Sequence, residues 1–156
     1  MFKSTIKMLI VLMLSTSILL MVYNEFMRVQ FTHQAKEVVN QQITCLAKNI
    51  YYEAASEPYE GKLAVAQVTL NRTRNVNFPK TVCGVVHQKV NGSCQFTWVC
   101  EQRYAIRNKY LWEESLIVAR KALLEIHVHD KIFEQKAMYY HADYIHPQWK
   151  RTKVTQ

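Results

Sequence analysis

Residues 43–74 read ITCLAKNIYYEAASEPYEGKLAVAQVTLNRTR, and this stretch decides the fold because it predicts two consecutive helices. The first is predicted over residues 43–56, where the i, i+3, i+4, i+7 pattern of a helix face is carried by Ile43, Leu46, Ala47, Ile50, Tyr51 and Ala54. Pro58 restricts the residue before it and marks the end of this helix. The second helix is predicted over residues 60–74, with an inner face of Leu63, Ala64, Ala66, Val68 and Leu70.

The remaining elements are shorter, apart from one more helix. Thr81 can cap a short helix that runs through Val86. Asn91-Gly92 is typical of a tight turn, so residues 86–98 form either a small hairpin or an irregular loop. A helix is predicted over residues 113–126, with inner residues Leu116, Ile117, Ala119, Ala122 and Leu123. Residues 137–141 predict a short strand. With only three glycines and several amphipathic stretches, the sequence indicates a mainly helical α+β domain.

An uncharged apolar segment precedes this domain. Residues 8–23 read MLIVLMLSTSILLMVY, and as a helix they span about 24 Å, a little less than a hydrocarbon core of about 30 Å. Phe26 and Met27 extend the apolar stretch, while Lys7 and Arg28 can reach the two membrane surfaces. We therefore predict a transmembrane signal anchor over residues 1–23, a helical stalk over residues 24–41 and a folded domain over residues 42–156.

A cleaved signal peptide and a buried helix of a soluble protein are the alternatives. Cleavage needs a small-x-small site just after the apolar core, and the residues after Tyr23 are Asn-Glu-Phe-Met-Arg. Anchor and cleaved signal alike would export the domain. Lys3 and Lys7 favour an N-terminus on the inside. The predicted location is the inner (cytoplasmic) membrane, crossed once, with the domain on its periplasmic or extracytoplasmic side.

The four cysteines agree with export. Cys45, Cys83, Cys94 and Cys100 lie outside the apolar segment and allow three complete disulfide pairings, between which the sequence does not choose. No C-x-x-C motif supports a zinc-ribbon or thioredoxin assignment. Reduced, buried thiols are the alternative for a cytosolic protein. A bridge between Cys94 and Cys100 would stiffen the short loop that they bracket.

The chain is basic, with a formal net charge of +8 and a pI near 9.4. In an exported protein this charge favours an anionic partner such as cell-wall polymer, anionic lipid or acidic polysaccharide. The basic residues are scattered along the sequence rather than clustered, which argues against a nucleic-acid partner.

Glu53 is a carboxylate on an apolar helix face. It follows Ile50 by three residues and Leu46 by seven, at the C-terminal end of the predicted helix. Burial and the negative end of the helix dipole would both raise its pKa, which suits a general acid. The alternative is a structural role in which Glu53 pairs with Arg72, Lys48 or a backbone donor. Glu57, one turn further on, could face the same cleft.

Two aromatic segments resemble the wall of a sugar-binding cleft. Residues 95–98, Gln-Phe-Thr-Trp, place an amide, a hydroxyl and two rings between two cysteines. Residues 139–141, together with Pro147 and Trp149, form a comparable polar and aromatic patch. Hydrophobic packing is the alternative for both segments.

No metal or cofactor is predicted. The histidine pairs at 127/129 and 141/146 match neither H-E-x-x-H nor another short zinc spacing. No G-x-S-x-G, P-loop or dinucleotide-binding motif occurs in the sequence.

Residues 46–61 (LAKNIYYEAASEPYEG) and 64–72 (AVAQVTLNR) resemble the SleB-type cell-wall hydrolases, the spore-cortex-lytic enzymes and their relatives. Residues 78–86 (FPKTVCGVV), 94–100 (CQFTWVC) and 140–143 (YHAD) continue the family pattern in the same order. Three departures stand out: Tyr52 replaces the usual alanine, Ala55-Ser56 replaces Arg-Gly, and Thr97 replaces serine. A salt bridge made by that arginine in relatives cannot form here, because position 55 is alanine.

The resemblance implies a compact lysozyme-like domain that acts on the glycan strands of peptidoglycan. It matches Glu53 to the family's catalytic glutamate and implies that Gln95, Thr97 and Tyr140 bind the substrate. Glu57 is predicted as a fifth site residue because it lies one helical turn after Glu53. It also favours lytic transglycosylation, in which one carboxyl acts twice, over hydrolysis with two carboxyls. For hydrolysis, Glu57 or Glu60 would be the nearby partner.

Two other functions stay open at this point. A non-catalytic peptidoglycan-binding or scaffold module on the same fold is consistent with the altered motif at Ala55-Ser56. A metal-dependent amidase or peptidase is disfavoured by the histidine spacing. Remodelling of a cell's own wall and lysis of a host by a phage are equally compatible with the sequence.

Overall fold

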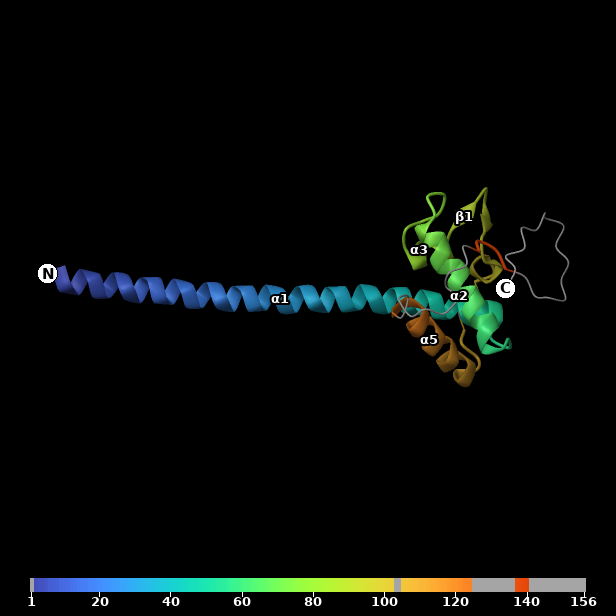
Figure 1. Ribbon diagram of the computed structural model, residues 1–156, viewed down its shortest axis with the longest axis horizontal. Coiled ribbons are helices and arrows are strands. Elements are labelled where there is room, and N and C mark those ends of the chain that lie inside the picture. Colours follow the sequence, from blue (N-terminus) through green and yellow to red (C-terminus); the bar gives the residue numbers. More distant parts are fainter. Residues whose placement is uncertain (1, 103–104, 125–136, 141–156) are drawn as a thin grey trace. The chain divides into compact units, whose positions relative to one another are not determined.

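The computed structural model describes residues 2–102, 105–124 and 137–140. The chain divides into two compact units, residues 1–39 and 40–156. Helix α1 (Phe2–Ala54) begins in the first unit and ends in the second (Figure 1).

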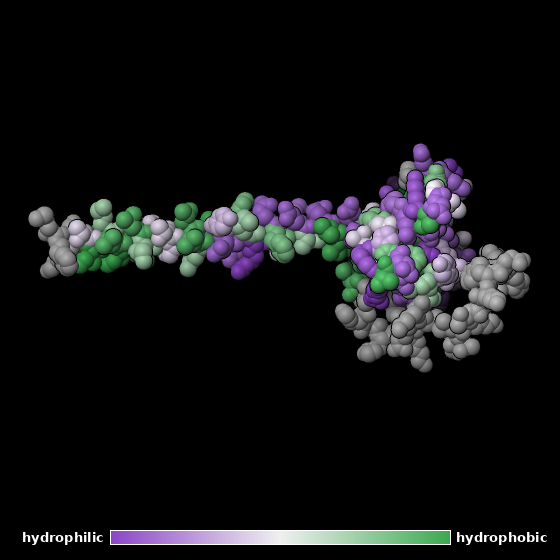
Figure 2. All heavy atoms as spheres, turned by 90° about the horizontal axis from the view of Figure 1, so that it is seen from above, coloured by the Kyte–Doolittle hydropathy of each residue, from purple (hydrophilic) through white to green (hydrophobic). Residues whose placement is uncertain are grey.

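The first unit is helical and carries its apolar side chains on the outside. Every large hydrophobic residue from Met8 to Val22 is more than half exposed, and Figure 2 shows these green side chains along the N-terminal part of α1. Among the described residues, one helix is long and apolar enough to cross a membrane, by length and composition only. A signal sequence would meet the same criterion.

The core of the second unit is built mainly from helices. The last turns of α1 contribute to it together with α2 (Tyr59–Arg74), α3 (Val82–Val86) and α5 (Lys109–Leu124), and α2 contacts both α3 and α5 (Figure 1). On the predicted inner face of the first helix, Ile43, Leu46, Ala47, Ile50 and Ala54 are buried, whereas Tyr51 is half-buried. The helix ends at Ala54, two residues before its predicted end. The fold class is thus mainly helical in the described part of the chain, as the sequence indicated.

The boundaries of α2 and α3 follow from their caps. Pro58 is the N-cap of α2, which starts one residue before its predicted position and ends at Arg74 as predicted. The Thr81 hydroxyl accepts a hydrogen bond from the Gly84 amide at 3.0 Å, which confirms Thr81 as the cap of α3. Residue 84 must be glycine, since a Cβ there would lie 2.8 Å from both Pro79 and Thr81 atoms.

The tight turn at Asn91-Gly92 produces the small hairpin that was one of the two predicted outcomes. Strand β1 (Lys89–Val90) pairs antiparallel with β2 (Ser93–Cys94). Asn91 and Gly92 both have positive φ, as a type I′ turn requires. The loop expected from Gln95 onward is replaced by a short helix, α4 (Thr97–Cys100). A four-residue helix is too short to leave a 3.6-residue period in the sequence.

Three further predictions are corrected. Helix α5 starts at Lys109, four residues before its predicted start, because Asn108 accepts from the Leu111 amide at 3.2 Å. Ile117 was expected on its inner face but is 64% exposed. The short strand predicted at residues 137–141 is wrong for the described residues 137–140, which have no regular secondary structure. The predicted end of the last helix, at 126, and His141 lie outside the described residues.

Two disulfides resolve the choice among the three pairings. Cys45 pairs with Cys83 and joins α1 to α3. Cys94 pairs with Cys100 and joins β2 to α4. The second bridge therefore brackets the segment that contains Gln95, Phe96 and Thr97.

Candidate active site

Glu53 lies in the last turn of α1 and is half-buried, as its place on the apolar face predicted. Burial raises the pKa of its carboxyl above the usual value, because the charged form loses hydration. A hydrogen bond from Tyr140 and the positive charge of Arg72 oppose this shift in part. The net result is a carboxyl whose neutral form persists to higher pH than that of an exposed glutamate.

Tyr140 is the hydrogen-bond partner of this carboxyl. Its hydroxyl donates to Glu53 Oε2 at 2.9 Å. Burial, the charge of Glu53 and this bond all raise the pKa of Tyr140, so the side chain remains a neutral phenol and a donor. No other hydrogen bond to the Glu53 carboxyl occurs among residues 2–102, 105–124 and 137–140.

Arg72, in the last turn of α2, places a positive charge beside the carboxyl. The residue is only 5% exposed, and its guanidinium carbon lies 5.4 Å from the ring centroids of Phe78, Phe96 and Tyr139. Burial lowers the pKa of Arg72. In the described part of the chain, Glu53 forms no ion pair with Arg72 or Lys48, two of the partners considered for a structural role.

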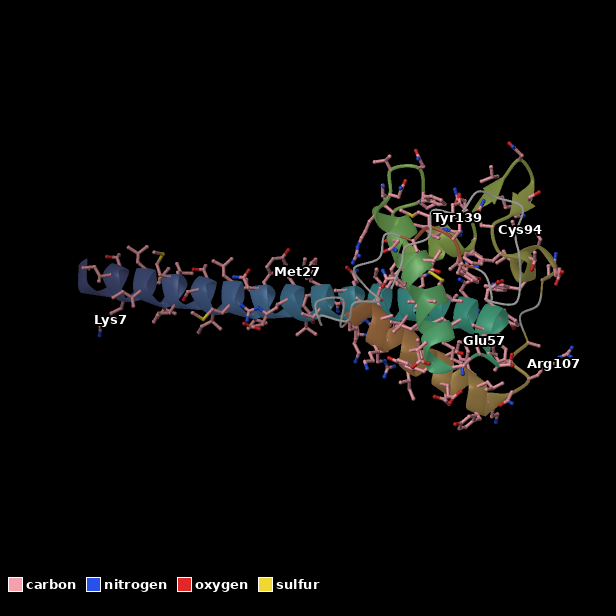
Figure 3. The ribbon with its side chains drawn as sticks, turned by 45° about the vertical axis from the view of Figure 1, so that its right-hand side comes forward. Lys7, Met27, Glu57, Cys94, Arg107 and Tyr139 are labelled. Atoms are coloured by element: carbon pink, nitrogen blue, oxygen red, sulfur yellow. A yellow bond between two sulfur atoms is a disulfide. The ribbon has the colours of Figure 1, made fainter. Side chains whose placement is uncertain are left out.

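An open cavity of about 320 Å³ brings these residues together, lined by Glu53, Arg72, Gln95, Phe96, Thr97, Tyr139 and Tyr140. Four of the five residues predicted to form the site therefore share one cavity: Glu53, Gln95, Thr97 and Tyr140. The fifth, Glu57, does not line it. Its amide donates to the Ala54 carbonyl. Its side chain packs against Gly61, where an added Cβ would lie 2.9 Å from the Glu57 Cβ. Figure 3 shows Glu57 apart from Tyr139.

A buried polar network holds the α4 wall of the cavity against α1. The Trp98 indole donates to Asn49 Oδ1 at 3.0 Å, and the Asn49 amide donates to the Thr69 hydroxyl at 3.1 Å. The Trp98 ring also stacks on Tyr52, with 4.7 Å between the centroids. Because Asn49 is one helical turn before Glu53, the network fixes α4 relative to the carboxyl.

Arg72 was not predicted to line the cavity, although it shows the same pattern as Glu53, a charged residue on the apolar face of a helix. It follows Val65 by seven residues and Val68 by four, so it is a charged residue on the buried face of α2. Phe96 and Tyr139 were recognised as parts of aromatic segments and not as neighbours of Arg72. Their proximity depends on contacts between residues far apart in the sequence.

This arrangement can donate a proton to a hydroxyl-rich ligand. The raised pKa of Glu53 supplies the acid, while amide, hydroxyl and aromatic side chains surround it. In the part of the chain that the structure describes, no group of three metal-ligating side chains occurs. The histidines at 127, 129, 141 and 146 lie outside the described residues.

Comparison with known proteins identifies the family. The cell wall hydrolase family matches residues 56–156. The chain belongs to this family. The match begins three residues after Glu53, so it covers α2–α5 and the cavity wall but not the acid itself.

Curated relatives place the chain among the SleB-type proteins, which confirms the resemblance. The spore cortex-lytic enzyme of Oceanobacillus iheyensis is 39% identical over 83 residues, 53% of this chain and 26% of that protein. The spore cortex-lytic enzyme of Bacillus subtilis is 47% identical over 49 residues, 31% of this chain and 16% of that protein. The chain thus spans about a quarter or less of the length of these relatives. No solved structure matches the chain.

The family motifs have clear structural roles in this chain. Residues 78–86 form the capped helix α3, and residues 94–100 form the bridged wall of the cavity. The motif at residues 64–72 supplies Arg72, whose positive charge acts on Glu53.

Proposed function

We propose that this cell wall hydrolase cleaves the glycan strands of peptidoglycan, with Glu53 as the general acid. The observation that carries the proposal is a half-buried carboxyl of raised pKa that lines an open cavity together with Gln95, Thr97 and Tyr140. Membership of the cell wall hydrolase family and the similarity to spore cortex-lytic enzymes support peptidoglycan as the substrate.

In the first step, Glu53 protonates the oxygen of the MurNAc–GlcNAc β-1,4 bond. The hydrogen bond from Tyr140 to Oε2 leaves Oε1 as the oxygen that carries and delivers the proton. As the C1–O bond breaks, GlcNAc leaves with a new hydroxyl and Glu53 becomes a carboxylate. Tyr140 and Arg72 stabilise this carboxylate, since both favour the charged form.

In the second step, the same carboxylate accepts the proton of the MurNAc C6 hydroxyl, whose oxygen bonds to C1. The product is a 1,6-anhydro sugar, and Glu53 is again neutral. We favour this lytic transglycosylation over hydrolysis because retaining and inverting glycosidases need a second carboxyl at a defined separation. Within the described residues, the cavity lining holds one carboxyl, that of Glu53.

Product analysis tests the reaction. Purified peptidoglycan digested with the exported domain is expected to yield fragments with 1,6-anhydro ends, identified by mass spectrometry after separation. Reducing MurNAc ends, heavier by one water, would replace transglycosylation by hydrolysis. Binding to peptidoglycan without release of any fragment would instead identify a non-catalytic binding module, and cleavage abolished by a chelator would indicate a metal-dependent peptidase or amidase.

We further propose that residues 1–23 anchor the protein in the cytoplasmic membrane, with a stalk at 24–41 and the catalytic domain of 42–156 on the outer side. The exposed apolar side chains of α1 support an anchor. The full-length protein is expected in the membrane fraction after an alkaline wash, with an intact mass that includes residues 1–23. A soluble product that lacks these residues would indicate a cleaved signal peptide.

The domain is also proposed to have a lysozyme-like arrangement. The support is an acid at the C-terminal end of a helix that faces a cavity walled by α4 and its neighbouring residues. An experimental structure that did not superpose on lysozyme around Glu53 would contradict this.

A further inference from the structure

The segment of residues 137–140 reaches the cavity without regular secondary structure, so its backbone groups need partners elsewhere. The Ala137 carbonyl accepts from Asn71 Nδ2 at 2.9 Å, and the Met138 carbonyl accepts from Arg72 Nε at 3.0 Å. The two donors are consecutive residues at the end of α2, 6% and 5% exposed. They thus contact consecutive carbonyls of a segment that lies 66 residues further along the chain.

Both donors are themselves held in place. Gln67, one turn earlier on α2, donates to Asn71 Oδ1 at 2.6 Å and so sets which side of the Asn71 amide faces Ala137. The guanidinium of Arg72 is in contact with three aromatic rings, which restrict its rotation. Asn71 is thus held from within α2, and Arg72 by Phe78 and Phe96 as well as by Tyr139 of the segment itself.

The consequence of these two bonds is the position of Tyr140. It follows Met138 by two residues, and its hydroxyl donates to Glu53 Oε2. We propose that Asn71 and Arg72 are positioning residues of the reaction, which hold residues 137–140 so that Tyr140 orients the carboxyl of Glu53. This inference rests on the proposed function of Glu53 as the acid.

A merely structural pair would behave differently from a positioning pair. If the two bonds only stabilise the fold, their loss lowers the free energy of unfolding and leaves the folded site unchanged. If they place Tyr140, their loss reproduces the loss of the Tyr140 hydroxyl. The Tyr140 bond lowers the pKa of Glu53. Since the acid must be protonated to act, removal of this bond moves the alkaline limb of the activity profile to higher pH.

The experiment compares Asn71→Leu, Tyr140→Phe and the double variant, with turnover of purified peptidoglycan measured across pH. Leucine matches asparagine in size and adds no charge. Each single variant is expected to lose about 10- to 100-fold in turnover, as expected for a misplaced catalytic group, and to shift the alkaline limb to higher pH. The double variant is expected to lose less than about twofold beyond Tyr140→Phe, because both changes remove one interaction.

Multiplied losses in the double variant, or an unshifted alkaline limb in Asn71→Leu, would overturn the inference. Thr81→Ala is the matched control: it removes the cap of α3 and destabilises the fold away from the cavity, so its pH profile should stay that of the parent. If Asn71→Leu does not fold, Arg72→Lys serves instead, since it keeps the charge and removes the planar donor to Met138. If Glu53→Gln remains active, the proposed function itself is wrong. If Glu53→Gln is inactive but the Asn71 and Arg72 variants behave like the parent, only the positioning role is wrong.

Discussion

Glu53→Gln is expected to lower turnover of peptidoglycan by about 10²–10⁴-fold, the range for loss of a general acid or base. Glutamine keeps the size of the side chain and an oxygen that can accept the hydrogen bond from Tyr140. It has no proton to give to the glycosidic oxygen and no charge with which to accept one afterwards. The measurement is release of soluble fragments from purified peptidoglycan under conditions where the parent follows steady-state kinetics.

Stability distinguishes this loss from misfolding. The pKa of Glu53 is raised in the folded state, so ionisation of the carboxyl costs stability as pH rises from the unfolded value through the folded one. At neutral pH the parent carries this cost and the glutamine variant does not. Glu53→Gln is therefore expected to melt at the same temperature as the parent or higher at pH 7. The difference should disappear below about pH 4, where the carboxyl is neutral in both states.

Two further carboxyls sharpen the result. Glu113→Gln is the matched control, because Glu113 is exposed on α5 and does not line the cavity around Glu53. It should retain the activity of the parent. Glu57→Gln separates the two chemical schemes: a small effect supports one carboxyl acting twice, whereas a loss comparable to that of Glu53→Gln would require a second catalytic carboxyl. Full activity of Glu53→Gln would remove the proposed acid altogether.

The half-buried position of the Glu53 carboxyl was predictable because it follows from the local helical period. Periodicity within α1 places Glu53 among buried residues, and its half-buried position confirms that inference. Gln95, Thr97 and Tyr140 came from the family resemblance, and their place in one cavity with Glu53 agrees with it. Their roles in binding remain predictions.

Long-range contacts were not predictable in the same way. The strand expected from residues 137–141 has the composition of a strand, but the carbonyls of residues 137 and 138 accept from Asn71 and Arg72 instead of from a neighbouring strand. The two donors lie 66 residues earlier in the chain, beyond the reach of a local pattern. The disulfide partners of the four cysteines depend in the same way on how α1 and α3 meet in space.

The two disulfides are expected to differ in their effect on stability. Cys45–Cys83 closes a loop with a sequence separation of 38, and Cys94–Cys100 one of 6. In the chain-entropy treatment, loss of the first bridge costs about 4 kcal/mol and loss of the second about 2 kcal/mol. Paired cysteine-to-serine variants, unfolded in denaturant without reductant, measure both values. A larger loss for the Cys94/Cys100 variant would contradict this order.

Loss of turnover is expected to follow the opposite order, with the larger loss on removal of Cys94–Cys100. Cys94 and Cys100 flank the segment that supplies Gln95, Phe96 and Thr97 to the cavity, so their removal frees a wall of the site. Cys45 and Cys83 join α1 to α3 and do not line the cavity, so the folded fraction of that variant should retain its turnover. Turnover per folded molecule, corrected for the fraction unfolded, tests this at a temperature where both variants are mostly native. The Cys45–Cys83 bridge acts mainly on the unfolded chain, whereas the Cys94–Cys100 bridge acts on the cavity wall. If the variant that loses more stability also loses more turnover per folded molecule, α4 does not depend on its disulfide for its position.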